Sequence, residues 1–190
     1  MKIGLFFGSF NPIHIGHLII AQTMAVNTDL KKVWFVVSPQ NPFKKSKNLL
    51  HEFDRFDLVE RAISDNPLLE VTDIEFHLPK PSYTIDTLVR LLEKYPQHEF
   101  KLIMGEDNLA QFPNWKNHEK ILEYAGLYVY PRPGSQPHNF RNHPQVNFVE
   151  APLLDISATF IRKAIAADRS IKYLVPDAVE EMIRLKKFYQ

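Results

Sequence analysis

Residues 3–37 read IGLFFGSFNPIHIGHLIIAQTMAVNTDLKKVWFVV, and this stretch decides the fold. The apolar run 3–7 stops at the turn-forming residues 8–12, which is the pattern of a buried strand and the turn after it. Residues from about 15 to 25 place apolar side chains at helical spacing, and the run 33–37 is a second buried strand that ends at Ser38-Pro39. A strand, a helix and a second strand in this order predict a right-handed βαβ unit.

The same alternation continues along the chain. We expect helices at 53–63, 85–92, 157–167 and 177–187, and strands at 69–71, 100–104, 127–130 and 146–149. In the helix 85–92, the apolar residues Ile85, Leu88, Val89 and Leu92 follow helical spacing and are expected to share one buried face. Ser157 and Asp177 stand where helix N-caps belong. The alternation predicts an α/β fold, a Rossmann-like doubly wound parallel sheet with helices on both faces.

Composition limits the class of protein. The 190 residues are 45% hydrophobic and 24% charged, which is typical of a globular chain and predicts one domain over residues 1–190. A net charge of +1 does not favour a nucleic-acid partner. The absence of cysteine excludes disulfides, thiol nucleophiles and cysteine-ligated metals. Without a long apolar run or a signal-peptide pattern, we expect no membrane association and a cytoplasmic protein, and we leave a homo-oligomer open.

Residues 8–17 carry the strongest chemical signal. In a parallel sheet ligands bind beyond the carboxyl ends of the strands, which directs attention to the loops 8–13, 38–50, 105–116 and 131–145. The helix after the first strand has an amino end that binds anions. Gly8 allows close approach of a phosphate and Gly16 allows a bulky group against the first helical turn. His14 and His17 lie three residues apart, so both imidazoles face the same way and are suited to phosphate oxygens.

Two histidines at this spacing have two other interpretations, a surface coincidence and half of a metal site. Their position after a buried strand, in a segment that also holds two glycines and a proline, favours phosphate binding. We therefore predict no protein-held metal.

With these residues in place, the segment resembles the (T/H)xGH signature of the nucleotidyltransferase superfamily, and the chain is similar to bacterial nicotinate-nucleotide adenylyltransferases. The opening of that family has Gly, Thr and Asp where this chain has Phe7, Ser9 and Asn11. The resemblance implies a single nucleotidyltransferase domain over 1–190, in which residues of about 157–190 form a C-terminal subregion that completes the ATP site.

A second signature, ISATFIR at 156–162, is similar to the family's Ile-Ser-Ser-Thr-x-Ile-Arg, with Ala158 in place of the second Ser. Ser157 is placed to cap a helix, Thr159 adds a hydroxyl in the first turn, and the planar guanidinium of Arg162 suits a phosphate. Further matches to the family are residues 81–87, 105–108, 112–116 and 131–134.

The resemblance assigns a role to each matched residue, and Lys44 and Lys45 are added because they are basic residues in the loop after the second strand. Catalysis falls to His14, His17 and Arg162. ATP binding falls to Gly8, Ser9, Phe10, Gly16, His17, Gly105, Asp107, Ser157, Thr159 and Arg162. Mononucleotide binding falls to Asn11, Lys44, Lys45, Thr84, Ile85, Trp115, Lys116 and Arg132. Mg²⁺ would be carried mainly by the ATP phosphates.

Within these sets, the backbone amides of Thr84, Ile85 and Lys116 would hold the nicotinate carboxylate, and the indole of Trp115 would stack on the pyridine. Asp107 would accept hydrogen bonds from ribose hydroxyls. Arg132, Lys44 and Lys45 are candidate cations for phosphate.

The implied reaction is adenylyl transfer from ATP to nicotinate mononucleotide, with in-line attack and no covalent intermediate, as a step of NAD biosynthesis. Nicotinamide mononucleotide adenylyltransferase and phosphopantetheine adenylyltransferase remain alternatives. Residues 14–17 also spell the HIGH sequence of class I aminoacyl-tRNA synthetases, and residues 44–47 faintly match their KMSKS loop, which should lie far downstream. A nucleotide sensor that releases no pyrophosphate is a further alternative.

Overall fold

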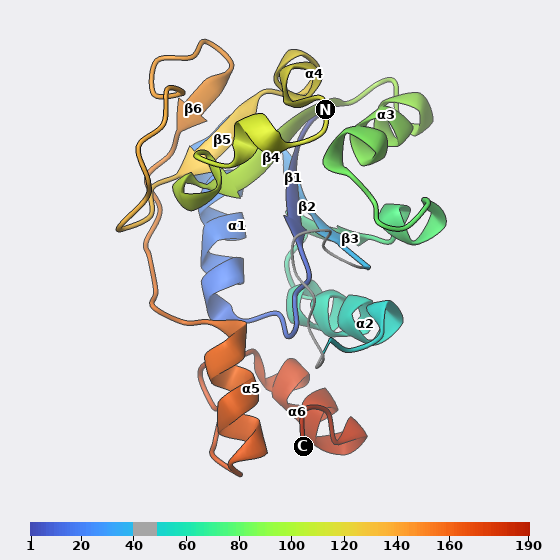
Figure 1. Ribbon diagram of the computed structural model, residues 1–190. Coiled ribbons are helices and arrows are strands. Elements are labelled where there is room, and N and C mark those ends of the chain that lie inside the picture. Colours follow the sequence, from blue (N-terminus) through green and yellow to red (C-terminus); the bar gives the residue numbers. More distant parts are fainter. Residues whose placement is uncertain (40–48) are drawn as a thin grey trace.

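The computed structural model describes residues 1–39 and 49–190; Lys44 and Lys45 lie outside this part of the chain. Its centre is a sheet of six strands in the order β3-β2-β1-β4-β5-β6, and every pair of neighbours is parallel (Figure 1). The strands are β1 (Lys2–Gly8), β2 (Lys32–Val37), β3 (Leu69–Thr72), β4 (Glu99–Gly105), β5 (Leu127–Tyr130) and β6 (Val146–Phe148). The strand order reverses between β1 and β4, so the crevice for a ligand is expected beyond Gly8 and Gly105.

Helices cover both faces of this sheet. They are α1 (Ile15–Asn27), α2 (Glu52–Ile63), α3 (Thr84–Lys94), α4 (His118–Tyr124), α5 (Ala158–Ala166) and α6 (Asp177–Lys186), with short 3-10 turns η1 (Ile74–His77), η2 (Glu106–Asn108) and η3 (Phe112–Asn114). Alternate side chains of each central strand point to opposite faces. In β2, Phe35 packs on the side of α1 and α2, whereas Trp34 and Val36 pack on the side of α3 and α4. The predicted doubly wound α/β fold is confirmed.

Two local expectations are wrong. Val89 of α3 is 39% exposed, because the buried face of this helix runs through Ile85, Leu88 and Leu91 instead. Asp177 is the first residue of α6 and not its cap, which is Pro176, and its carboxylate accepts a 2.7 Å hydrogen bond from Lys172. Ser157, by contrast, caps α5, since its hydroxyl accepts the N–H of Phe160 at 3.2 Å.

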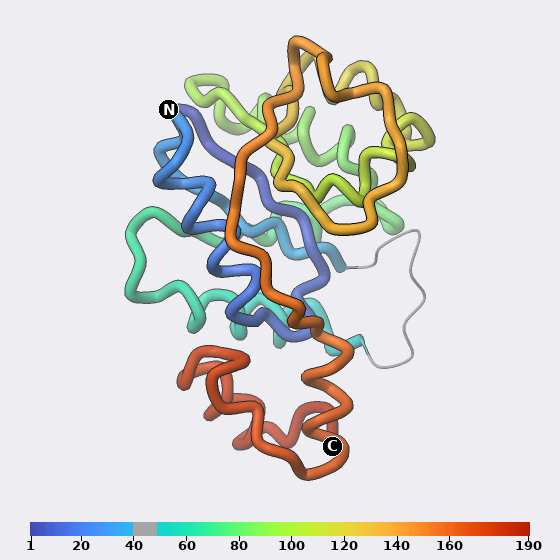
Figure 2. The backbone as a smooth tube through the Cα atoms, turned by 90° about the vertical axis from the view of Figure 1, so that its left-hand side faces the viewer, coloured from blue at the N-terminus to red at the C-terminus, as the bar shows by residue number. Residues whose placement is uncertain are grey.

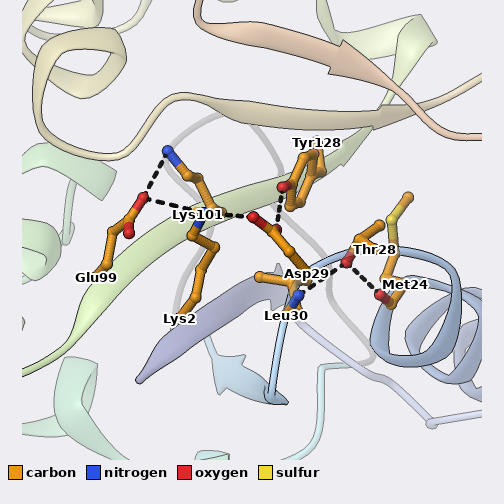
Figure 3. Close-up of polar contacts among 8 residues, drawn as sticks. All are labelled: Lys2, Met24, Thr28, Asp29, Leu30, Glu99, Lys101 and Tyr128. Carbon is orange, nitrogen blue, oxygen red and sulfur yellow. Dashed lines mark hydrogen bonds and ion pairs between the residues drawn. The ribbon is translucent and has the colours of Figure 1, made fainter.

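A polar network closes the amino-terminal edge of the sheet (Figure 3). Asp29, between α1 and β2, pairs with Lys2 of β1 and accepts a hydrogen bond from the Tyr128 hydroxyl of β5. Glu99 pairs with Lys101 at 3.1 Å and with Lys2 at 3.6 Å. These contacts join three strands to the end of α1 at the edge opposite the expected ligand crevice.

The last two helices lie beyond the carboxyl ends of the strands. After β6 the chain runs the length of the molecule to reach α5, as Figures 1 and 2 show. The N–H of Ile15, at the start of α1, donates to the carbonyl of Leu174 at 3.0 Å, and Ile161 and Ile183 join the apolar core of α1 and α2. None of the helices within residues 1–39 and 49–190 is long and apolar enough to cross a membrane.

Candidate active site

The loop between β1 and α1 turns sharply at Phe10, which has a left-handed backbone with φ 44°. Its ring is buried against Phe6, Phe35 and His17 in the core, so the Phe10 side chain is not available to a ligand. A Cβ on Gly8 would stand 2.7 Å from this ring. Glycine at position 8 is therefore required by the packing of Phe10, a reason that the sequence did not reveal.

His14 and His17 stack with ring centroids 3.7 Å apart at the start of α1. A Cβ on Gly16 would lie 3.1 Å from Nδ1 of His14, so the glycine makes room for this imidazole. The N–H of His14 donates to Nδ1 of His17 at 3.3 Å. Because Nδ1 of His17 accepts, the proton of its neutral ring sits on Nε2, which is then the available donor.

Both imidazoles are neutral in the free protein at pH 7. Burial first and the positive charge of Arg132 second lower the pKa of His14 to about 4. Burial, with His14 and Arg132 adding to it, lowers the pKa of His17 well below its usual range. Nδ1 of His14 is buried and has no hydrogen-bond partner within the described part of the chain. An unpaired buried nitrogen costs free energy, which a bound anion or water would offset.

Arg162 brings the second signature to the first. Its Nη1 donates to the carbonyl of Asn11 at 2.6 Å and its Nη2 donates to the Thr159 hydroxyl at 3.1 Å. The amino end of α5, capped by Ser157, therefore lies beside the loop that leads into α1. Two segments about 150 residues apart in sequence meet at one place, as an ATP site built from both requires.

Arg55 supports this loop and was not predicted as a site residue. It is completely buried, and its guanidinium donates to the carbonyls of Ser9 (2.6 Å), Ser38 (2.8 Å), Pro39 (2.9 Å) and Leu50 (2.9 Å). The signal was present in the sequence, because Arg55 lies on the same helical stripe as Leu58, Val59 and Ala62. A charged residue on an apolar stripe indicates a buried polar role.

A cavity of about 190 Å³ lies beyond the ends of β1 and β4. Predicted site residues that line it are Gly8, Thr84, Gly105, Trp115 and Lys116. The Trp115 ring packs at 5.4 Å from Phe112, and the Lys116 ammonium pairs with Asp86 at 2.9 Å and lies over the Tyr83 ring. Ile85 turns its side chain into the core, so only its backbone is available to a substrate.

Glu75 is a buried carboxyl in the wall of this cavity, and sequence reasoning missed it. Its two oxygens accept the hydroxyls of Thr87 at 2.7 Å and Ser82 at 3.0 Å. Burial raises the pKa of Glu75, and the hydroxyls of Thr87, Ser38 and Ser82 oppose the rise. The contacts tie the turn before α3 to its first helical turn, so Glu75 fixes the backbone at Thr84.

Asp107 and Arg132 face each other across the ends of β4 and β5, with 3.9 Å between a carboxylate oxygen and Nε. The Arg132 guanidinium also lies over the Tyr130 ring, 5.4 Å from its centroid. Asn11 is more constrained than its predicted substrate role implies: its side-chain oxygen accepts the N–H of Leu50 at 3.3 Å and the Tyr189 hydroxyl at 2.8 Å.

In the described ranges, 1–39 and 49–190, no three acidic or histidine side chains gather to hold a metal ion. The groups that converge at α1 and α5 are N–H donors and a guanidinium. Such groups bind anions and not Mg²⁺, which prefers oxygen ligands. The place where α1 and α5 meet is therefore suited to an anion.

Comparison with known proteins agrees with this arrangement. The family model described as cytidylyltransferase-like matches residues 5–164. A protein of Cytophaga hutchinsonii named probable nicotinate-nucleotide adenylyltransferase is 64% identical, and the alignment covers 100% of this chain and 98% of that protein. A Flavobacterium johnsoniae protein of the same name is 50% identical over 100% of both chains.

Solved structures share the fold. The Plasmodium falciparum nicotinic acid mononucleotide adenylyltransferase in complex with NaAD superposes with a TM-score of 0.82 over 99% of this chain and 97% of that chain, at 19% identity. A second structure of that enzyme, complexed with APC, gives a TM-score of 0.81 at 19% identity over 99% of this chain and 96% of that chain. On the family model, the full-length relatives and the meeting of the two signatures, this chain belongs to the cytidylyltransferase-like family and, within it, to the nicotinate-nucleotide adenylyltransferases.

Proposed function

We propose that this protein transfers the adenylyl group of ATP to nicotinate mononucleotide, giving nicotinate adenine dinucleotide and pyrophosphate. The observation that carries the proposal is the cavity beside Gly8 and Gly105. It places Thr84, Trp115 and Lys116, the residues that would recognise a pyridine carboxylate, at the end of the same strand that leads into the His14–His17 pair. An acceptor and a polyphosphate would thus meet at one sheet edge.

The chemistry needs no protein nucleophile. An oxygen of the mononucleotide phosphate attacks the α-phosphorus of ATP, a P–O bond forms, and the bond to the β-phosphate bridging oxygen breaks in line as pyrophosphate leaves. The protein contributes positioning and charge stabilisation. Nε2–H of His17, the guanidinium of Arg162 and the amino ends of α1 and α5 would take up the charge on the leaving phosphates.

The remaining assignments follow the same geometry. Arg132 is a candidate for phosphate and Asp107 for ribose hydroxyls. Lys44 and Lys45 lie outside the described residues, and their assignment to the mononucleotide phosphate rests on the sequence alone. Ser9, Phe10 and Asn11 would contribute backbone groups of the β1–α1 loop. Mg²⁺ would arrive on the ATP phosphates, and no step above is assigned to it. Residues of about 157–190 would complete the ATP site.

The test is pyrophosphate release with ATP and, in turn, nicotinate mononucleotide, nicotinamide mononucleotide and phosphopantetheine. We expect turnover with the nicotinate substrate and a lower kcat/KM for the other two. Preference for the amide or for phosphopantetheine would select one of the alternative adenylyltransferases. Binding of ATP without pyrophosphate release would identify a nucleotide sensor.

The acceptor pocket has its own test. Replacing Trp115 by Ala removes a stacking face worth about 0.5–1.5 kcal/mol, so the KM for the mononucleotide should rise by roughly two- to tenfold. Trp115→Phe, which keeps an aromatic face, is the matched control. A rise in the KM for ATP alone would place Trp115 in the other half of the site.

A further inference from the structure

Tyr189, which follows α6, reaches back to the start of the chain. Its hydroxyl donates a 2.8 Å hydrogen bond to the side-chain oxygen of Asn11, 178 residues away in sequence. The ring is half-buried and lines a cavity of about 430 Å³ together with Thr159 and Arg162. The segment after α6 therefore contributes to the place where the two signatures meet.

Asn11 connects Tyr189, Leu50 and Arg162. Its side-chain oxygen receives Tyr189 and the N–H of Leu50, while its backbone carbonyl receives Nη1 of Arg162 at 2.6 Å. Because Arg162 rests on that carbonyl, a displacement of Asn11 displaces the guanidinium as well. The loop that leads to His14 would shift with it, since Asn11 is part of that loop.

Resting on the proposed function, we propose that Tyr189 is a positioning residue of the ATP site: its hydroxyl fixes Asn11 and, through it, the guanidinium of Arg162. Tyr189 itself contacts no reacting atom in this role. Burial raises the pKa of the Tyr189 hydroxyl, while Arg162 and Arg55 lower it and Asp54 raises it. The net rise keeps the hydroxyl protonated at neutral pH, as a donor to Asn11 must be.

The test is Tyr189→Phe, which removes one oxygen and keeps the ring. We expect kcat/KM for ATP to fall by about three- to tenfold, the factor that one hydrogen bond is worth. The KM for nicotinate mononucleotide should stay within about a factor of two, because Asn11 is not one of the residues that line the pyridine cavity. The affinity for a non-hydrolysable ATP analogue, measured by calorimetry, should fall by a similar factor.

Tyr173→Phe is the matched control. Tyr173 is 83% exposed, so loss of its hydroxyl should leave both substrates' constants and the unfolding temperature unchanged. A merely structural role for Tyr189 would lower the unfolding temperature and weaken both substrates equally, and this outcome would overturn the proposal, as would an unchanged kcat/KM for ATP.

A double-mutant cycle tests the route through Asn11. In the Asn11→Ala background, Tyr189→Phe should have no further effect on ATP affinity, because the acceptor is already gone. Additive losses would contradict the route. If Asn11→Ala does not fold, the comparison of Tyr189→Phe with Tyr173→Phe still decides. Failure of the proposed function can be told apart from failure of this proposal. The first would appear as no pyrophosphate release by the unaltered protein, whereas the effect of Tyr189→Phe on binding of the ATP analogue is measured without an acceptor.

Discussion

Nε2 of His17 is the donor that the α1 amino end is expected to offer to the leaving phosphates, because Nδ1 of the same ring already accepts the N–H of His14. Replacing His17 by Ala should lower turnover by roughly 10²–10³, the scale for one preorganised donor. Steady-state pyrophosphate release measures it. The ring also packs on Phe6 and Phe10, so rates are compared well below the unfolding temperature of the variant.

His77→Ala serves as the control for the His17 variant. The His77 side chain is 71% exposed, and its loss should leave turnover unchanged. Turnover of His17→Ala close to that of the unaltered protein would remove His17 from the chemistry.

His14 makes stability depend on pH. Its pKa is about 4 in the folded protein against 6.5 in the unfolded chain, so between these values the unfolded chain binds a proton that the folded protein does not. The free energy of unfolding therefore rises with pH through this window. The contribution of His14 is fully present above pH 6.5 and is lost as the pH falls toward 4. Urea titrations of the protein and of His14→Gln should differ in slope by about 1.4 kcal/mol per pH unit within the window. Equal slopes would show that His14 is not buried as a neutral ring.

At the scale of elements, Glu75 of η1 lines the acceptor cavity and its hydrogen bonds to Ser82 and Thr87 connect η1 to the start of α3. Glu75→Gln keeps one accepting oxygen and replaces the other by an NH₂, so one hydroxyl must turn to accept and the charge-assisted hydrogen bonds that fix the turn at Ser82 are weakened. The KM for nicotinate mononucleotide should rise by about three- to tenfold and the KM for ATP should stay nearly constant. Kinetics with each substrate varied in turn measure the split.

Glu93→Gln is the matched control for Glu75, because the Glu93 side chain is 61% exposed on the far part of α3. It should change neither constant. If Glu75→Gln raised both KM values to the same extent, the carboxyl would support the fold in general and not the acceptor turn.

The elements that the sequence predicted best are those whose apolar pattern is contained within the element itself. The runs that became β1 and β2 are apolar because both faces of a central parallel strand are buried, and this signal is local. Val89 was expected to be buried because the apolar residues of α3 fit two overlapping helical faces, one through Val89 and one through Leu91. Only the packing of α3 on the sheet decides that Leu91 is buried. Glu75 and Tyr189 carried no local signal. The partners of Glu75, Ser82 and Thr87, lie 7 and 12 residues along the chain, and Asn11 lies 178 residues from Tyr189, so only the tertiary fold brings them together.

For the whole molecule, the question is whether α5 and α6 form a unit of their own. Ile161, Met182 and Ile183 belong to the same buried cluster as Phe6 of β1 and Phe35 of β2. A shared core predicts one cooperative transition. Trp34 and Trp115 lie on the other face of the sheet, so tryptophan fluorescence reports that face, while hydrogen exchange at α5 and α6 reports the C-terminal helices.

We expect urea unfolding followed by fluorescence, by far-UV circular dichroism and by exchange at Ile161 and Ile183 to give one midpoint. Met182 is only 5% exposed, so Met182→Ala leaves a cavity and should lower the free energy of unfolding by about 2–5 kcal/mol. All three urea midpoints should fall together. Leu185→Ala in the same helix, at a position 69% exposed, should move none of them. An earlier loss of protection in α5 and α6 while the fluorescence stays native would mean that the C-terminal helices dock as a separate unit. Under that outcome Arg162 would reach Asn11 only when this unit is closed, and the ATP site would be assembled by docking, whereas a single transition means that the fold itself holds the two signatures together.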